Sequence, residues 1–254
     1  MAKKNFVYDR LSKRIASEER SKAQREAERM RQEFTANVSH ELKTPLQSIS
    51  GYAELLKGGM VKEEDVQQFA ERIYSESQRM ITLVNDILEL SHLDEGMEDM
   101  VREDVNLYKV AVSAVSSLED EAETADVSLE LTGQDSVING YGQLLSLIVY
   151  NLCENGIKYN NPNGSVKVDV SDFKDRAVLT VNDNGIGIPL DQQERVFERF
   201  YRVDKSHSKE VGGTGLGLSI VKHAAAIHNG DIHLVSVPKY GTTITITFPK
   251  KKEK

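Results

Sequence analysis

The chain has 254 residues, a formal net charge of −8 and a single cysteine. This length allows one or two domains with an ample core, and the negative charge argues against general nucleic-acid binding. Cys153 cannot form an internal disulfide, which suits a reducing compartment. No apolar run approaches the roughly 20 residues that cross a bilayer, and the N-terminal sequence MAKKNFVYDR lacks the apolar stretch of a signal peptide. We therefore expect a cytosolic protein, or the cytosolic part of a longer one.

The N-terminal part of the chain consists mainly of helix-forming residues. Residues 10–34 are mostly helix formers of mixed charge, which predicts a long solvated helix or the start of a coiled coil. An apolar stripe at helical spacing follows, made of Phe34, Val38, Leu42, Leu46, Ile49, Ala53 and Leu56. The sequence KGGM at 57–60 interrupts it, and a second amphipathic helix is expected from about Glu63 to Leu93. These features predict an antiparallel hairpin, which would cover its surplus apolar surface by forming a four-helix bundle in a homodimer.

The second part of the chain mixes strands and helices. An acidic, glycine-containing stretch at 92–104 is typical of a hinge. Residues 105–125 are expected to form the end of a strand and then a helix. Further strands are predicted near 127–131, 136–139, 165–172, 176–183, 231–238 and 241–249, with helices over 141–159 and 215–230. Because these elements do not alternate strictly as strand and helix, they indicate an α+β sandwich.

His40 is the first candidate functional residue. It lies about 200° around the helix from Val38 and from Leu42, so it should point away from the apolar stripe towards solvent. A metal ligand needs partners, and the other five histidines offer no suitable spacing; we expect His223 and His228 at the surface or in a groove. A neutral imidazole can act as a nucleophile while the adjacent Glu41 takes up the proton of the other ring nitrogen.

Two glycine-rich stretches suggest a nucleotide site. In DNGIGIP (183–189), Asp183 could accept a hydrogen bond from an amino group such as that of adenine, and the glycines would let backbone approach a flat ligand. An ordinary tight turn is an equal alternative for this stretch alone. In GGTGLGLSIV (212–221), four glycines lead into a helix whose N-terminal amides would face anions. This stretch fits neither a dinucleotide fingerprint nor a P-loop.

A third stretch, NLCENGIKYN (151–160), supplies polar side chains on one helix. Asn151 and Asn155 share a face, and an amide oxygen suits magnesium. Lys158 could neutralise phosphate charge. For the two asparagines taken alone, a structural role is the alternative, because asparagines in helices more often serve as caps or surface residues. The polar segment 193–211 reads as a lid over a nucleotide, or as a surface loop anchored by Phe197 and Phe200.

Taken together and in order, these motifs resemble the kinase core of two-component sensor histidine kinases. FTANVSHELKTPL resembles the phospho-acceptor box, NLCENGIKY the N box, DNGIGIP the G1 box, FERFYR the F box and GGTGLGLSIV the G2 box, over about residues 31–248. The resemblance implies a connector helix (1–30), a dimerisation and phosphotransfer hairpin (31–95), a linker (96–103) and a gyrase/Hsp90-like ATP-binding sandwich (104–250). Gly156 departs from the alanine that is common in the N box.

The resemblance also implies roles for residues. His40 would be the phospho-acceptor, Glu41 the general base, and Thr44 the residue that orients water for phosphatase activity. Asn155 would hold Mg²⁺. Contacts to ATP would come from Asn151, Asn155, Lys158, Tyr159, Asp183, Gly185, Gly187, Ile188, Phe200, Arg202, Gly213, Thr214, Gly215, Leu216, Gly217 and Leu218.

The partners that it implies are a second copy of the chain and the receiver domain of a response regulator. The expected setting is the cytoplasmic portion of a bacterial membrane sensor, with no membrane contact by this chain. Two alternatives remain at this point. One is a gyrase/Hsp90-type ATPase module without phosphotransfer, which would need no nucleophile such as His40; the other is an inactive scaffold that binds nucleotide and partner.

Overall fold

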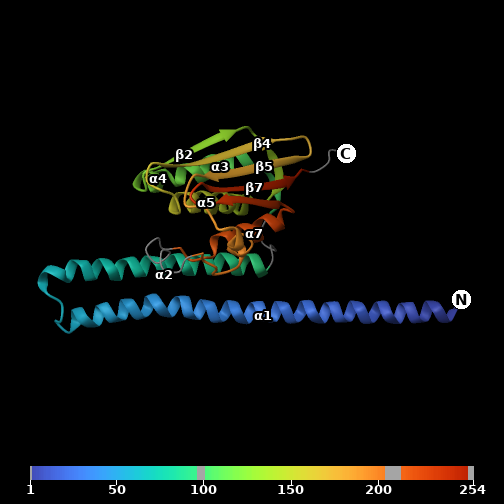
Figure 1. Ribbon diagram of the computed structural model, residues 1–254, viewed down its shortest axis with the longest axis horizontal. Coiled ribbons are helices and arrows are strands. Elements are labelled where there is room, and N and C mark those ends of the chain that lie inside the picture. The colour runs from blue at the N-terminus through green and yellow to red at the C-terminus, as the bar shows by residue number, and fades with distance from the viewer. Residues whose placement is uncertain (1, 96–100, 204–212, 251–254) are drawn as a thin grey trace. The chain divides into compact units, whose positions relative to one another are not determined.

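The computed structural model describes residues 2–95, 101–203 and 213–250. The chain divides into two compact units, Met1–Ile81 and Thr82–Lys254. The first unit is helical and the second mixes strands with helices (Figure 1). The predicted α+β class, with a helical hairpin ahead of a sandwich, is confirmed.

The first unit is built on one very long helix. Helix α1 (Ala2–Lys57) runs for 56 residues, so the expected connector and the first helix of the hairpin are continuous. It ends where Gly59 adopts a φ of +63° and the Met60 N–H donates to Leu55 O at 3.1 Å, a common helix C-terminus. The one-turn helix η1 (Glu63–Asp65) then leads into α2 (Val66–Glu95).

The two helices of the first unit contact each other through side chains but enclose little. Tyr52 of α1 meets Phe69 of α2 edge to face, with ring centroids 5.5 Å apart. Among the side chains of this unit that the structure describes, only Pro45 is fully buried. Two apolar residues of the predicted stripes are largely exposed, Leu46 at 56% and Val66 at 43%. A single hairpin therefore leaves much of its apolar surface uncovered. None of the described helices has the length and apolar character needed to cross a membrane.

The second unit begins with the last turns of α2 and continues through short elements. They are β1 (Glu103–Asn106), α3 (Leu107–Ser117), α4 (Glu119–Thr124), β2 (Val127–Gly133), β3 (Val137–Gly140), α5 (Gly142–Lys158), β4 (Gly164–Asp172), β5 (Arg176–Asp183), η2 (Leu190–Gln192), η3 (Arg195–Phe197), α7 (Gly217–Ile227), β6 (Asp231–Val237) and β7 (Gly241–Pro249).

Five strands form the main sheet in the order β2-β4-β5-β7-β6, with β2 parallel to β4 and the other neighbours antiparallel. A separate pair joins β1 to β3. Helices α3, α5 and α7 lie along one face of the main sheet (Figure 1). The strands alternate as that arrangement requires: Val166, Val168 and Val170 of β4 are fully buried beneath the helices.

One histidine differs from the expectation. His228 is 3% exposed, so its predicted place at the surface or in a groove was wrong. Its Nε2 accepts the Tyr141 N–H at 2.9 Å, and its Nδ1 lies 2.7 Å from Ala224 O, to which it donates. Burial lowers the pKa of His228 and favours the neutral ring that this pattern needs. The helical spacing could not reveal this position, because β3 and Phe248 of β7 cover the end of α7 only in the folded unit.

Candidate functional site: a phospho-acceptor helix and a nucleotide cavity

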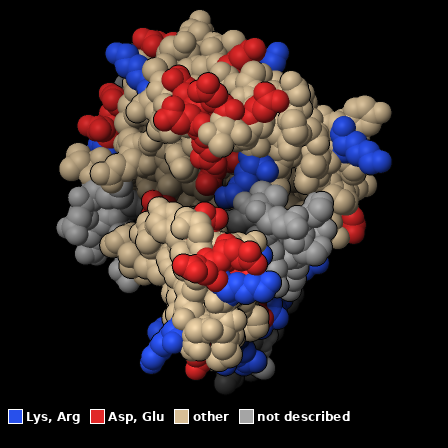
Figure 2. All heavy atoms as spheres, turned by 90° about the vertical axis from the view of Figure 1, so that its left-hand side faces the viewer, with Lys and Arg blue, Asp and Glu red and all other residues tan. Residues whose placement is uncertain are grey.

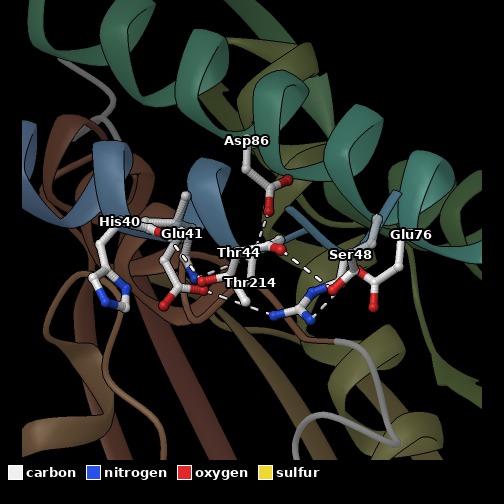
Figure 3. A network of polar contacts seen from close by, with 9 residues as sticks. His40, Glu41, Thr44, Ser48, Glu76, Asp86 and Thr214 are labelled. Carbon is white, nitrogen blue, oxygen red and sulfur yellow. Dashed lines mark hydrogen bonds and ion pairs between the residues drawn. The ribbon is translucent and has the colours of Figure 1, made fainter. Parts of the chain in front are cut away.

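His40 lies on the exposed side of α1, as its helical position predicted. Thr44, one turn later, is exposed on the same helix, and its Oγ1 donates to His40 O at 3.2 Å. Ser48 repeats the pattern by donating to Thr44 O at 3.3 Å, and these side chains follow one another along α1 in Figure 3. The imidazole therefore stands on a regular helix, free to meet a partner from solvent.

Glu41 is held by a residue that the sequence analysis did not identify. Its Oε2 lies 3.7 Å from Nη2 of Arg79 on α2, and Nη1 of Arg79 lies 4.0 Å from Glu76 Oε2. The three side chains are 32%, 18% and 29% exposed, in the order Glu41, Arg79, Glu76. Their pairing depends on how two helices face each other, which spacing along the sequence does not give.

The second unit contains a cavity of about 1510 Å³. Most of the nucleotide residues predicted from sequence line it: Asn151, Asn155, Lys158, Tyr159, Asp183, Gly187, Ile188, Arg202, Gly213, Thr214, Gly215, Gly217 and Leu218. They come from α5, the end of β5, the loop after it and the start of α7. The fold thus brings three distant motifs to one hollow. Part of the expected lid, residues 204–211, lies outside the described residues.

Asp183 ends β5 and faces the cavity. Its Oδ1 accepts the Gly185 N–H at 2.9 Å and the Thr242 N–H at 3.2 Å. Its Oδ2 accepts no hydrogen bond from any residue that the structure describes. Burial raises the pKa of Asp183, and the two N–H donors act against that rise. One oxygen is therefore anchored and the other is available to a donor in the cavity.

Thr242 was missed from sequence because only the register of β5 and β7 brings it beside Asp183. Tyr150, Leu147 and Ile244 also line the cavity without a motif of their own. The periodicity of α5 and β7 could have shown which faces are apolar, but not that they border a ligand site.

Three residues that the sequence predicted to contact the nucleotide do not line the cavity but lie next to residues that do. They are Gly185, Phe200 and Leu216. A Cβ at Gly185 would meet Tyr159 O at 2.3 Å, so the chains pass too closely for any other residue. Phe200 adopts a φ of +63° and its N–H donates to Gly215 O at 2.9 Å, which fixes the glycine-rich loop. Leu216 is fully buried just before α7.

The polar side chains of α5 reach the same cavity. Asn151 is 7% exposed and its Nδ2 donates to Leu147 O at 2.9 Å. A Cβ at Gly217 would lie 2.6 Å from Asn151 Oδ1, so any larger residue where α7 begins would have to displace the Asn151 amide. Lys158 Nζ lies 3.6 Å from Glu154 Oε1. The side chain of Asn155 forms no hydrogen bond with a described residue and remains available in the cavity.

Acidic side chains border this cavity from α2. Asp86 Oδ2 accepts a hydrogen bond from Thr214 Oγ1 at 2.5 Å, as Figure 3 shows. Burial raises the pKa of Asp86 to about 6, the hydrogen bond from Thr214 acts against that rise, and Glu154 adds to it.

Acidic residues also gather on the face drawn in Figure 2. They lie on the side where α4, with the sequence EDEAET, is seen in Figure 1.

Comparison with known proteins agrees with this arrangement. Residues 30–96 match the family model "His Kinase A (phospho-acceptor) domain", and residues 140–252 match "Histidine kinase-, DNA gyrase B-, and HSP90-like ATPase". The sensor-like histidine kinase SenX3 of Mycolicibacterium smegmatis is 42% identical over 88% of this chain and 58% of its own length. The sensor histidine kinase WalK of Bacillus subtilis is 37% identical over 91% of this chain and 38% of its own. The chain thus spans less than two thirds of either relative.

Solved structures show the same fold. The mycobacterial sensor histidine kinase MprB is 29% identical, with a TM-score of 0.52 over 59% of this chain and 97% of its own. The histidine kinase ThkA, solved in complex with the response regulator protein TrrA, is 23% identical, with a TM-score of 0.70 over 87% of this chain and 62% of that chain.

The fold and the site together define a class of protein: a helical hairpin with an exposed histidine, followed by a sandwich domain of the gyrase and Hsp90 ATPase type that contains a large cavity. The chain belongs to the two-component sensor histidine kinases and comprises the two domains of their kinase core.

Proposed function

We propose that this chain transfers the γ-phosphoryl group of ATP to His40 and then to an aspartate of a response-regulator receiver domain. The observation that carries the proposal is the exposed imidazole of His40, which stands on α1 within a matched phospho-acceptor domain. A gyrase-type or Hsp90-type ATPase without phosphotransfer needs no such group. The relatives' names, which describe sensor kinases, support the same function.

In the first step one nitrogen of the neutral His40 ring attacks the γ-phosphorus. A nitrogen–phosphorus bond forms, the bond from phosphorus to the bridging oxygen breaks, and ADP leaves with that electron pair. The other ring nitrogen becomes strongly acidic, and Glu41 takes its proton. In the second step the receiver's carboxylate attacks the same phosphorus and the nitrogen–phosphorus bond breaks; the ring leaves with that electron pair and takes a proton back from Glu41, so it departs as neutral imidazole.

The cavity residues divide the work of binding ATP. Asp183 would accept the adenine amino group through Oδ2, because Oδ1 is already occupied by two backbone N–H groups. Lys158 would offset phosphate charge, and the amides at the start of α7 would face the phosphates.

Magnesium fits the cavity as a companion of the nucleotide. Among the described residues, no three His, Cys, Asp or Glu side chains gather to hold a metal. Asn155 offers a single amide oxygen, which suits an ion that keeps phosphate and water oxygens as its other ligands. We assign Asn155 to hold Mg²⁺, which would neutralise charge on the γ-phosphoryl group.

The exposed apolar residues of the hairpin support assembly as a homodimer. Leu46 on α1 and Ile81 on α2 are 56% and 53% exposed, more than an isolated hairpin can leave in water at no cost. Two copies packed as a four-helix bundle would cover them. Within a bacterial sensor, this chain would form the cytoplasmic portion of a membrane-anchored protein.

The test is incubation of the chain with Mg²⁺ and γ-labelled ATP. We expect a label that is labile in acid and stable in alkali, and that is absent from the His40→Gln variant. ATP hydrolysis without any stable label would favour the ATPase module instead. Label that persists in the variant would remove His40 from the role of acceptor.

Phosphatase activity towards the phosphorylated regulator is a second proposed function, which rests on Thr44. Its hydroxyl is exposed one turn beyond His40, where it can orient water at a docked receiver. We expect Thr44→Ala to lose most phosphatase activity while it keeps His40 labelling. A Thr44→Ser variant, which restores the hydroxyl, is the matched control.

A further inference from the structure

We propose that Arg79 is a positioning residue for Glu41: it holds one carboxylate oxygen of Glu41 so that the other oxygen is kept for the imidazole proton of His40. The proposal rests on the function proposed above and assigns a role to a residue outside the sequence motifs. Arg79 lies on α2, whereas His40 and Glu41 lie on α1.

The guanidinium of Arg79 is fixed at two points. Nη2 lies 3.7 Å from Glu41 Oε2, and Nη1 lies 4.0 Å from Glu76 Oε2. Glu76 Oε2 is buried and accepts no hydrogen bond from a described residue, so its compensation comes from this ion pair. Arg79 itself is only 18% exposed. A planar fork between two carboxylates, removed from most of the solvent, has little freedom to turn.

The pairing leaves Glu41 with one oxygen for catalysis. The ion pair between Arg79 and Glu41 involves Oε2 of the carboxylate. Figure 3 shows the carboxylate of Glu41 next to the His40 ring, so Oε1, which the ion pair does not use, is left for that ring. An exposed glutamate on a helix samples several rotamers, and most of them carry the carboxylate away from a neighbour in sequence. Arg79 restricts that sampling before ATP arrives, which reduces the entropy lost in reaching the reactive geometry.

Glu76 has a part in the same arrangement. Before proton transfer, two carboxylates face one guanidinium. When Glu41 takes the proton from His40 it becomes neutral, and the cation of Arg79 keeps Glu76 as its second partner. Arg79 is therefore never left as an unpaired, partly buried charge during the step.

The experiment measures the rate of His40 labelling in a single turnover, at saturating ATP and Mg²⁺, in the full chain. Arg79→Ala should slow labelling by roughly fivefold to tenfold, as expected for the loss of one charge-assisted contact. Arg79→Lys, which keeps the charge but not the fork, should recover part of the rate. In a Glu41→Gln background, Arg79→Ala should cause no further loss, because its effect acts through the carboxylate.

Arg72→Ala is the matched control. Arg72 also lies on α2 and reaches α1, where its Nη1 is 3.3 Å from the Tyr52 hydroxyl, but it does not contact Glu41. We expect it to label at the wild-type rate, with thermal unfolding followed for both arginine variants. The proposal would be overturned if Arg72→Ala slowed His40 labelling as much as Arg79→Ala does. It would also be overturned if Arg79→Ala slowed labelling further in the Glu41→Gln background. Either result would indicate a general effect on the hairpin.

The outcomes separate this proposal from the function on which it rests. A wild-type chain that takes no label on His40 overturns both. A wild-type chain that is labelled on His40, with Arg79→Ala at the same rate, overturns only the role of Arg79.

Discussion

The two units of this molecule differ in how far they can stabilise themselves. In the second unit, helices and a five-stranded sheet enclose many fully buried side chains, among them Leu145, Ile148, Leu179 and Ile246. Among the side chains of the first unit that the structure describes, Pro45 alone is buried. The nucleotide domain therefore carries its own core, whereas the hairpin needs apolar partners from outside itself.

The largest expected effect is on dimerisation, when a charge is placed in the apolar surface through which we expect the hairpin to pack. Leu46→Glu places a charge where we expect the second hairpin to pack, once in each copy, at a cost of roughly 3 kcal/mol or more per dimer. Sedimentation should show the dimer dissociation constant raised by about 100-fold or more. Gln47→Glu, one residue along the same helix, adds the same charge and should leave the dimer intact. An unchanged dissociation constant in the Leu46 variant would place the interface elsewhere.

In the second unit, the next largest expected effect is on ATP affinity, when Asp183 is changed. Asp183→Asn keeps the size of the side chain but can turn an amide donor towards the adenine amino group, which removes a charge-assisted hydrogen bond worth about 2 kcal/mol. Calorimetry should show roughly 30-fold weaker ATP binding, with the dimer unaffected. Asp169→Asn is the control, because Asp169 accepts from Thr132 and Ser171 and does not line the cavity.

A smaller effect is expected at Asp86. Its folded-state pKa of about 6 lies above the unfolded value of 3.8, so its contribution to stability is present below pH 4 and is lost as the pH rises through 6. Asp86→Asn should therefore stabilise the second unit at pH 7.5, by about 1–2 kcal/mol, and the gain should shrink as the pH falls towards 4. Denaturant unfolding at several pH values measures this. A gain of the same size at pH 4 and 7.5 would contradict the assigned cause.

The smallest effect concerns the buried ring of His228. Its folded-state pKa is lowered, so its contribution to stability is present above pH 6.5 and is lost as the pH falls through the folded value. The difference in unfolding free energy between wild type and His228→Gln should narrow between pH 7.5 and 5.5. His233→Gln, at an exposed position on β6, serves as the comparison for the same substitution at a histidine outside the core.

The sequence predicted most of the fold because its periodicities are local. The apolar stripe on α1, the alternation in β4 and β5, and the glycine that ends α7 each determine an element from its own residues. Short strands near β1 and β3 were predicted, but their pairing was not, since the two strands are separated in the chain by helices and another strand. The burial of His228 was also missed, because it depends on Tyr141 and Phe248, which are distant in sequence.

The sequence alone determined that a solvent-facing histidine on a helix precedes a glycine-rich nucleotide domain, because helical spacing and motif order are properties of the chain itself. The tertiary structure decided which groups complete each site: Thr242 beside Asp183 through strand register, and Arg79 beside Glu41 through the facing of two helices. Contacts of this kind depend on how separate elements pack, and no pattern within one element specifies them.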